Sequence, residues 1–145
     1  MGLLDEILAS YNALDPADQE AMARDVMEAT AGRPWFPNPG PQSTAVETEA
    51  DQLFYGGEAG GGKSDLICGL ALTEHKNSLL LRRTNADTLG LEERIAEIVG
   101  NRDGFNGQKK IWRRPDGRMV EIGGCQWEND KQKYKGRPHD LIGFD

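Results

Sequence analysis

Eight consecutive residues carry the clearest chemistry in this sequence. Gly57-Glu58-Ala59-Gly60-Gly61-Gly62-Lys63-Ser64 fits the pattern G-x-x-x-x-G-K-[ST] at every fixed position. Glycines let a loop curl until its backbone N–H groups surround phosphate oxygens, and a helix that begins at the loop adds free N–H groups of its own. In such a loop Lys63 contacts the β- and γ-phosphates and Ser64 binds Mg²⁺. The motif therefore predicts that residues 57–64 bind ATP and Mg²⁺.

A second oxygen ligand for magnesium is expected at the end of an apolar strand. In such sites the Ser or Thr of the loop shares the ion with an aspartate from a neighbouring strand. Asp145 directly follows the apolar run 141–144 and fits this position. We therefore expect Ser64 and Asp145 to hold one Mg²⁺ ion. The alternatives are a glycine turn with a solvated lysine and an acidic residue that merely ends a strand.

These residues can meet only if strands and helices alternate along the chain. Short apolar runs predict strands at 53–55 and 78–81. Apolar residues at helical spacing predict helices over 63–73 and 89–99, the second ending at Gly100. This order indicates an α/β fold of the P-loop NTPase type, in which helices flank a parallel sheet.

The remaining segments are predicted to surround this core. Periodic apolar residues predict an N-terminal helical lead of two helices, which Gly32 ends. Residues 33–50, rich in Pro, Thr and Glu, predict an extended loop. Two β-like runs within 110–122 predict a β-hairpin insertion. We therefore expect the helical lead and its loop over residues 1–50 and an incomplete P-loop ATPase core over 51–145.

Charge and composition limit the kinds of partner. The 145 residues carry a net charge of −7 and contain no apolar run long enough to span a membrane, which predicts a cytoplasmic protein without membrane contact. The charge is uneven, because residues 108–137 hold nine basic and four acidic side chains, a net +5. This basic segment, residues 108–137, is a candidate surface for a polyanion. Cys68 and Cys125 form no metal-binding spacing.

The order of several short segments resembles the large terminase subunit of phages. In chain order these segments are residues 55–64, 80–84, 115–117, 133–137 and 140–145. The first resembles the family's phosphate loop with its doubled and tripled glycines, the second its second strand with arginines, and the last its Walker B strand. The resemblance runs from about Trp35 to the last residue and implies the ATP-hydrolysing motor that packages viral DNA.

The resemblance also implies roles outside the phosphate loop. Part of the proline-rich loop resembles an adenine-side motif, in which the Gln42 amide bonds a donor and an acceptor on adenine and Trp35 or Phe36 packs nearby. The alternative is a loop whose aromatic residues lie in the core. Arg82 and Arg83 are candidates to stabilise charge on the γ-phosphate, because a guanidinium is always charged and forms forked contacts. The alternative is arginines in solvent at a strand end.

The implied partners are double-stranded DNA, a portal protein and a small terminase subunit, with a homo-oligomer when the protein is full length. Basic and aromatic side chains of the basic segment are candidates for contact with DNA phosphates, which requires no reading of sequence. They are Lys109, Lys110, Trp112, Arg113, Arg114, Arg118, Trp127, Lys131, Lys133, Tyr134, Lys135 and Arg137. The alternative is an ordinary solvated basic hairpin.

The sequence departs from the family after its last residue. The family continues with a glutamate that positions the attacking water, then with further strands and a nuclease domain. We therefore expect a chain truncated after the Walker B strand, which binds ATP and Mg²⁺ but is not a competent ATPase alone. The alternative is a nucleotide-binding fragment of another P-loop family, such as a helicase, without motor activity.

Overall fold

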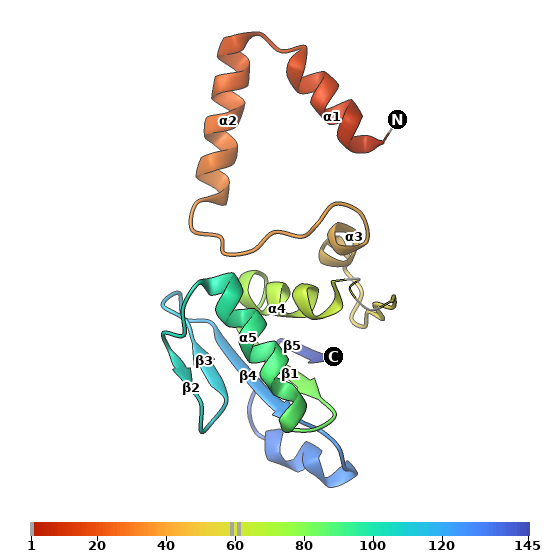
Figure 1. The fold of residues 1–145 in the computed structure, drawn as a ribbon, viewed down its shortest axis with the longest axis vertical. Coiled ribbons are helices and arrows are strands. Elements are labelled where there is room, and N and C mark those ends of the chain that lie inside the picture. Colours follow the sequence, from red (N-terminus) through yellow and green to blue (C-terminus); the bar gives the residue numbers. More distant parts are fainter. Residues whose placement is uncertain (1, 59, 61) are drawn as a thin grey trace. The chain divides into compact units, whose positions relative to one another are not determined.

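The computed structural model describes residues 2–58, 60 and 62–145. Ala59 and Gly61, two residues of the predicted phosphate loop, lie outside the described residues. The chain folds as two units, Met1–Arg33 and Pro34–Asp145 (Figure 1). Residues 34–50, grouped with the N-terminal helices in the sequence prediction, therefore belong to the second unit. No helix in the described part of the chain is long and apolar enough to cross a membrane.

Helices α1 and α2 make up the first unit, as the sequence predicts. α1 spans Leu3–Asn12 and α2 spans Pro16–Thr30. The Asp15 carboxylate caps α2 by accepting a hydrogen bond from a backbone N–H of its first turn. The apolar stripe of α2 includes Met22 and Val26, which are 46% and 52% exposed. This stripe is therefore not buried within the first unit.

The second unit is built on a mixed sheet, which among the described residues has five strands in the order β2-β3-β4-β1-β5. They are β1 (Asn77–Arg82), β2 (Phe105–Asn106), β3 (Ile111–Arg113), β4 (Met119–Gly124) and β5 (Leu141–Phe144). β1 pairs in parallel with β4 and β5, whereas β2–β3 and β3–β4 are antiparallel. The α/β class and the hairpin are confirmed. The sheet predicted as parallel is mixed, because the hairpin joins the same sheet beside β1.

The helices of the second unit are α3 (Pro41–Glu47), α4 (Lys63–Thr73), α5 (Leu89–Val99) and the short 3₁₀ helices η1 (Ala86–Thr88) and η2 (Glu128–Tyr134). Two of them, α4 and α5, agree with the prediction, whereas α3, η1 and η2 were not predicted. α3 corrects the prediction of an extended loop over residues 33–50. Pro41 occupies the first helical position, where its missing N–H is not needed, and Gln42 and Ala45 are buried. Burial thus favours a helix where composition indicated a loop.

The strand predicted at residues 53–55 does not form. These residues have no strand pairing, and Leu53 and Phe54 are 49% and 94% exposed. A strand is stable only beside a neighbour that accepts its backbone hydrogen bonds. β5 is an edge strand whose pairing within the described residues is with β1 alone. The glycine-rich loop, residues 57–62, is therefore preceded by a segment without regular secondary structure rather than by a strand of the sheet.

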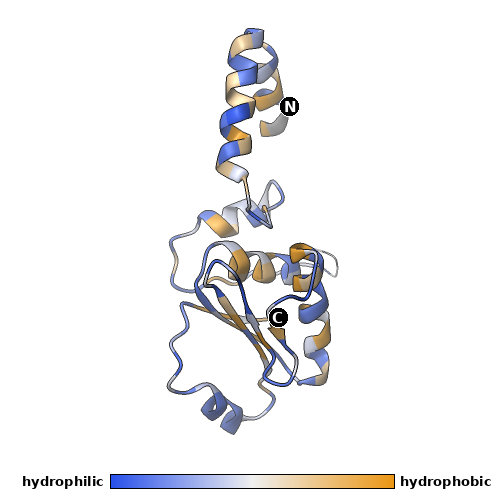
Figure 2. Ribbon diagram, turned by 90° about the vertical axis from the view of Figure 1, so that its left-hand side faces the viewer, coloured by the Kyte–Doolittle hydropathy of each residue, from blue (hydrophilic) through white to orange (hydrophobic). Residues whose placement is uncertain are grey.

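The core lies between the sheet and the two helices α4 and α5, which cover one side of it (Figure 1). Its buried members are Cys68, Ala71, Leu72, Leu80, Leu91, Ile95, Trp112, Val120 and Ile122. Side chains alternate along β4, so Glu121 points to the opposite side from its neighbours in this core. There the segment after β4 covers the sheet, with the Tyr134 hydroxyl donating to the Gly124 carbonyl. This segment, including η2, is largely hydrophilic (Figure 2).

Candidate functional site

The glycine-rich loop leads directly into α4. Gly60 and Gly62 have φ angles of 86° and 76°, in the left-handed region that side chains disfavour. A Cβ added to Gly62 would also collide with the Gln42 amide. The first N–H groups of a helix have no partner within it, so the start of α4 adds donors to those of the loop. These N–H groups at the start of α4 are the donors that the motif assigns to phosphate, and anion binding there stays a prediction.

Lys63 is the first residue of α4, and its side chain turns back over the loop. Its ammonium donates hydrogen bonds to the carbonyl oxygens of Gly57, at 2.6 Å, and Glu58, at 3.2 Å. These contacts keep the charged group at the mouth of the loop instead of in open solvent. To contact phosphate, as the motif predicts, Lys63 would have to exchange these carbonyls for phosphate oxygens.

Ser64, Arg82 and Asp145 come together at one end of the sheet. The Ser64 hydroxyl donates to both carboxylate oxygens of Asp145, at 2.8 and 3.1 Å, although these residues lie 81 positions apart in the sequence. Arg82 donates from Nε and Nη2 to Asp145 Oδ2, and its Nη2 lies 3.2 Å from Ser64 Oγ. The Asp145 side chain is only 10% exposed, so these contacts are partly shielded from water. The two residues predicted to share a metal ion are therefore in direct contact.

The oxygen atoms of Ser64 and Asp145 fit magnesium. Mg²⁺ prefers hard oxygen ligands and commonly takes one or two carboxylates from a protein, with water and nucleotide phosphates supplying the rest. No group of three or more His, Cys, Asp or Glu side chains converges in the described ranges 2–58, 60 and 62–145.

The two candidate arginines have different surroundings. Arg82 is the last residue of β1, and its side chain lies on the side of the sheet that faces α4. Arg83 follows outside the strand and is exposed, and no hydrogen bond or ion pair of its side chain is recorded within the described residues. Arg82 is thus the arginine that lies beside the other site residues.

The adenine-side prediction meets a different arrangement. Trp35 is 6% exposed and packs in a cluster with Ala45 and Leu66, which is the alternative that the sequence left open. Phe36 is 48% exposed. Gln42 is buried, with its Nε2 donating to the Gly62 carbonyl at 3.0 Å and its Oε1 accepting from a backbone N–H at 2.8 Å. To read adenine, the Gln42 amide would have to exchange these hydrogen bonds.

Asp65, absent from the sequence prediction, is the centre of a network around the loop. Its Oδ2 accepts from Trp35 Nε1 at 3.0 Å and from Gln42 Nε2 at 3.3 Å. Its Oδ1 accepts from Nε of Arg94 at 2.9 Å and from Nη2 of the same guanidinium. Burial raises the pKa of the Asp65 carboxyl, but hydrogen bonds from Arg94, Trp35 and Gln42 outweigh this and hold the pKa below its ordinary value. Its place directly after Ser64 was the one sequence signal that could have identified it.

Many cations of the basic segment already have partners within the second unit. Pairs with carboxylates join Lys110 to Glu92, Arg118 to Asp116, Lys131 to Glu128, Lys133 to Asp130 and Arg137 to Glu121. Within the described residues, the side chains of Lys109, Arg113, Arg114 and Lys135 have no recorded hydrogen bond or ion pair. The surface offered to DNA is therefore smaller than the net charge of +5 indicates.

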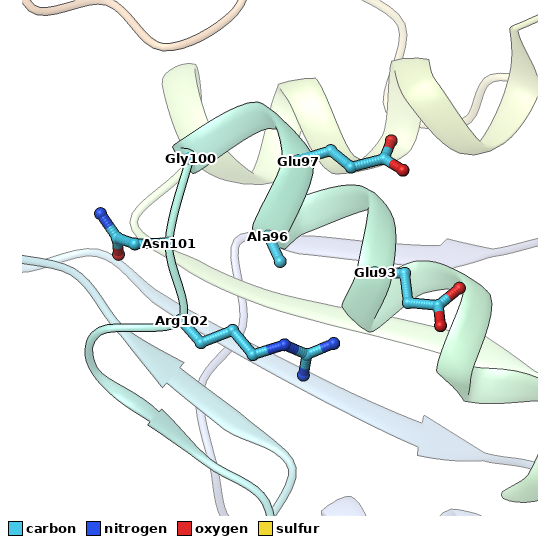
Figure 3. A pocket seen from close by; sticks show the side chains of 6 residues that line it. All are labelled: Glu93, Ala96, Glu97, Gly100, Asn101 and Arg102. Atoms are coloured by element: carbon cyan, nitrogen blue, oxygen red, sulfur yellow. The ribbon is translucent and has the colours of Figure 1, made fainter.

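A surface hollow lies elsewhere, at the C-terminal end of α5 (Figure 3). Its lining residues are Glu93, Ala96, Glu97, Gly100, Asn101 and Arg102. None of the residues predicted from the motif lines it, and its walls combine two carboxylates with one guanidinium. A hollow of mixed charge offers no arrangement suited to a nucleotide, so it is not the candidate site.

Comparison with protein-family models, curated proteins and solved structures finds no match to this chain. The resemblance to phage large terminase subunits therefore stays a prediction. The case for a function rests on the geometry of the chain's own residues around Lys63, Ser64, Arg82 and Asp145.

Proposed function

We propose that the second unit binds ATP together with Mg²⁺ at the glycine-rich loop. One observation carries this proposal: Ser64 of the motif contacts Asp145, the residue expected to share its metal ion. Asp145 lies 81 positions from Ser64 in the sequence, so no local pattern of the motif brings the two side chains together. An unrelated glycine turn would give no reason for these two oxygen groups to meet.

Each residue of the site has a separate task in this proposal. Backbone N–H groups of the loop and of the start of α4 surround the phosphates, and Lys63 adds a mobile positive charge. Ser64 and Asp145 supply oxygen ligands for Mg²⁺, which neutralises charge on the β- and γ-phosphates. Arg82, which contacts both of these residues, would stabilise charge on the γ-phosphate.

At the level of biological role, we propose part of an ATP-driven motor that packages DNA, as in the large terminase subunit of phages. Support comes from the order of the segments in the sequence and from the proposed nucleotide site, to which three of them contribute residues. Hydrolysis also needs a group that orients the attacking water. Asp145 is assigned to the cation and is therefore not available to orient water. We expect this chain to bind ATP but to hydrolyse it poorly.

A nucleotide titration tests the proposal. Removal of the Lys63 ammonium in Lys63→Ala should weaken binding of a fluorescent ATP analogue in Mg²⁺ about 10- to 100-fold, the range for a charge-assisted hydrogen bond. Lys76→Ala removes the same charge from an exposed lysine beyond α4 and should leave the affinity within about twofold. Equal affinities for the wild type and Lys63→Ala would refute the assignment of the loop.

A further inference from the structure

Asp65 poses an electrostatic problem for the proposed site. It follows Ser64 directly and lies in the first turn of α4, where the triphosphate is expected. A carboxylate at a helix start interacts favourably with the helix dipole, but it repels a nearby polyanion. Its side chain is 18% exposed, so water screens this repulsion only in part. A neighbouring positive charge is needed to offset it.

Arg94 of α5 supplies that charge. Two nitrogens of its guanidinium donate to one oxygen of Asp65, a forked contact that fixes the position of the charge. A second contact, from Nη1 to Glu97 at 2.8 Å, holds the guanidinium from the other side. No phosphate-binding role is required of Arg94 itself, because its donors are directed at these carboxylates.

The same carboxylate also reaches the loop through a chain of hydrogen bonds. Asp65 Oδ2 accepts from Gln42 Nε2, and that nitrogen also donates to the carbonyl of Gly62, the last loop glycine. Trp35 Nε1 donates to the same oxygen and fixes its direction. Asp65 thus connects α5, through Arg94, to the backbone that should surround the phosphates.

We infer that Arg94 is a positioning residue for phosphate binding, acting through Asp65: it neutralises the Asp65 carboxylate so that a triphosphate can bind beside it. The inference rests on the proposed nucleotide site and adds to it a residue that touches no nucleotide. This role differs from a purely structural one in the effect of a second substitution, at Asp65. Loss of Arg94 weakens phosphate binding because Asp65 is charged, so removing the Asp65 charge as well should restore it.

Four variants test this relation by nucleotide titration. Arg94→Gln should weaken ATP binding about fivefold, with smaller losses for ADP and AMP, because repulsion grows with phosphate charge. Asp65→Asn should bind ATP at least as tightly as the wild type, and the double variant should return to within about twofold of Asp65→Asn. Arg94→Lys keeps the charge and should stay within about twofold of the wild type. Arg24→Gln removes an exposed arginine of α2, controls for net charge and should leave the affinity within about twofold.

The outcomes separate this inference from the proposed function. A double variant that binds as weakly as Arg94→Gln, or equal losses for ATP and AMP, would show that the network only supports the fold and would overturn the inference. An unchanged affinity in Arg94→Gln would overturn it as well. If any of these results occurs but Lys63→Ala still weakens ATP binding in the same assay, the inference is refuted and the proposed function is retained. If Arg94→Gln does not fold, Asp65→Asn and Arg94→Lys decide, and an Asp65→Asn protein that binds ATP more weakly than the wild type contradicts the inference.

Discussion

Two regions of this protein carry positive side chains that the sequence assigns to phosphate groups, and they differ in where those side chains find partners. At the candidate nucleotide site, Lys63 contacts loop carbonyls and Arg82 contacts Ser64 and Asp145, the two residues assigned to Mg²⁺. In the basic segment, cations such as Lys110 and Lys133 pair with carboxylates that belong to no predicted site. A motif specifies geometry, whereas a charge count leaves the partners of each charge unknown.

Removal of the Asp145 carboxylate at the candidate nucleotide site should have the largest effect on ligand binding. In Asp145→Asn the metal loses its charged ligand, so Mg²⁺ should no longer strengthen ATP binding, a loss of about 10- to 100-fold measured with Mg²⁺ and little change without it. Asp116→Asn makes the same change in the hairpin turn and should keep the Mg²⁺ effect. Retention of the full Mg²⁺ effect in Asp145→Asn would rule out Asp145 as a ligand.

Removal of the Arg82 guanidinium should have a smaller effect, and it should strengthen metal binding rather than weaken it. Its guanidinium contacts the same two residues that are assigned to Mg²⁺, so the arginine and the cation compete. Arg82→Gln should therefore bind Mn²⁺, as a probe for Mg²⁺ without nucleotide, about tenfold more tightly, as followed by electron paramagnetic resonance. Arg83→Gln removes an exposed charge next to it and should change the affinity little. Weaker Mn²⁺ binding in Arg82→Gln would contradict the competition.

The smallest effect distinguishes two parts of the basic segment. Arg113→Gln with Arg114→Gln removes two charges without a recorded ion pair, whereas Lys131→Gln with Lys133→Gln removes two paired charges. The hydrogen bond from Lys133, with those from the backbone N–H groups of Trp127 and Gln126, lowers the pKa of Asp130 to about 2. The arginine variant should lose several-fold more affinity for duplex DNA and show a smaller salt dependence by about 2 in log–log slope. Equal losses, or an affinity independent of salt, would remove the basic segment as a DNA surface.

Local patterns predicted much of the fold. The spans of α4 and α5 and the end of α5 at Gly100 follow from helical spacing and a left-handed glycine cap. The hairpin and β5 follow from turn residues and a short apolar run. Each of these signals lies within a dozen residues, which is the range over which a sequence pattern can be read without the rest of the structure.

The errors have causes that lie outside any local pattern. The run 53–55 has strand-forming residues but no neighbour to pair with, and α3 forms because Gln42 and Ala45 are buried by residues distant in the sequence. The choice of Arg82 over Arg83 depends on which side of β1 faces α4. The contact of Asp65 with Arg94 joins residues 29 positions apart on different helices, with no spacing that signals it.

A crystal structure with a non-hydrolysable ATP analogue and Mg²⁺ tests the central claim most directly. The account predicts the β- and γ-phosphates within the glycine-rich loop, contacted by Lys63, and Mg²⁺ bound by Ser64 Oγ and the Asp145 carboxylate, either directly or through water. Arg82 should have moved off Asp145 Oδ2 to make room for the ion. Nucleotide bound away from the loop, or Mg²⁺ held without Ser64 and Asp145, would contradict it.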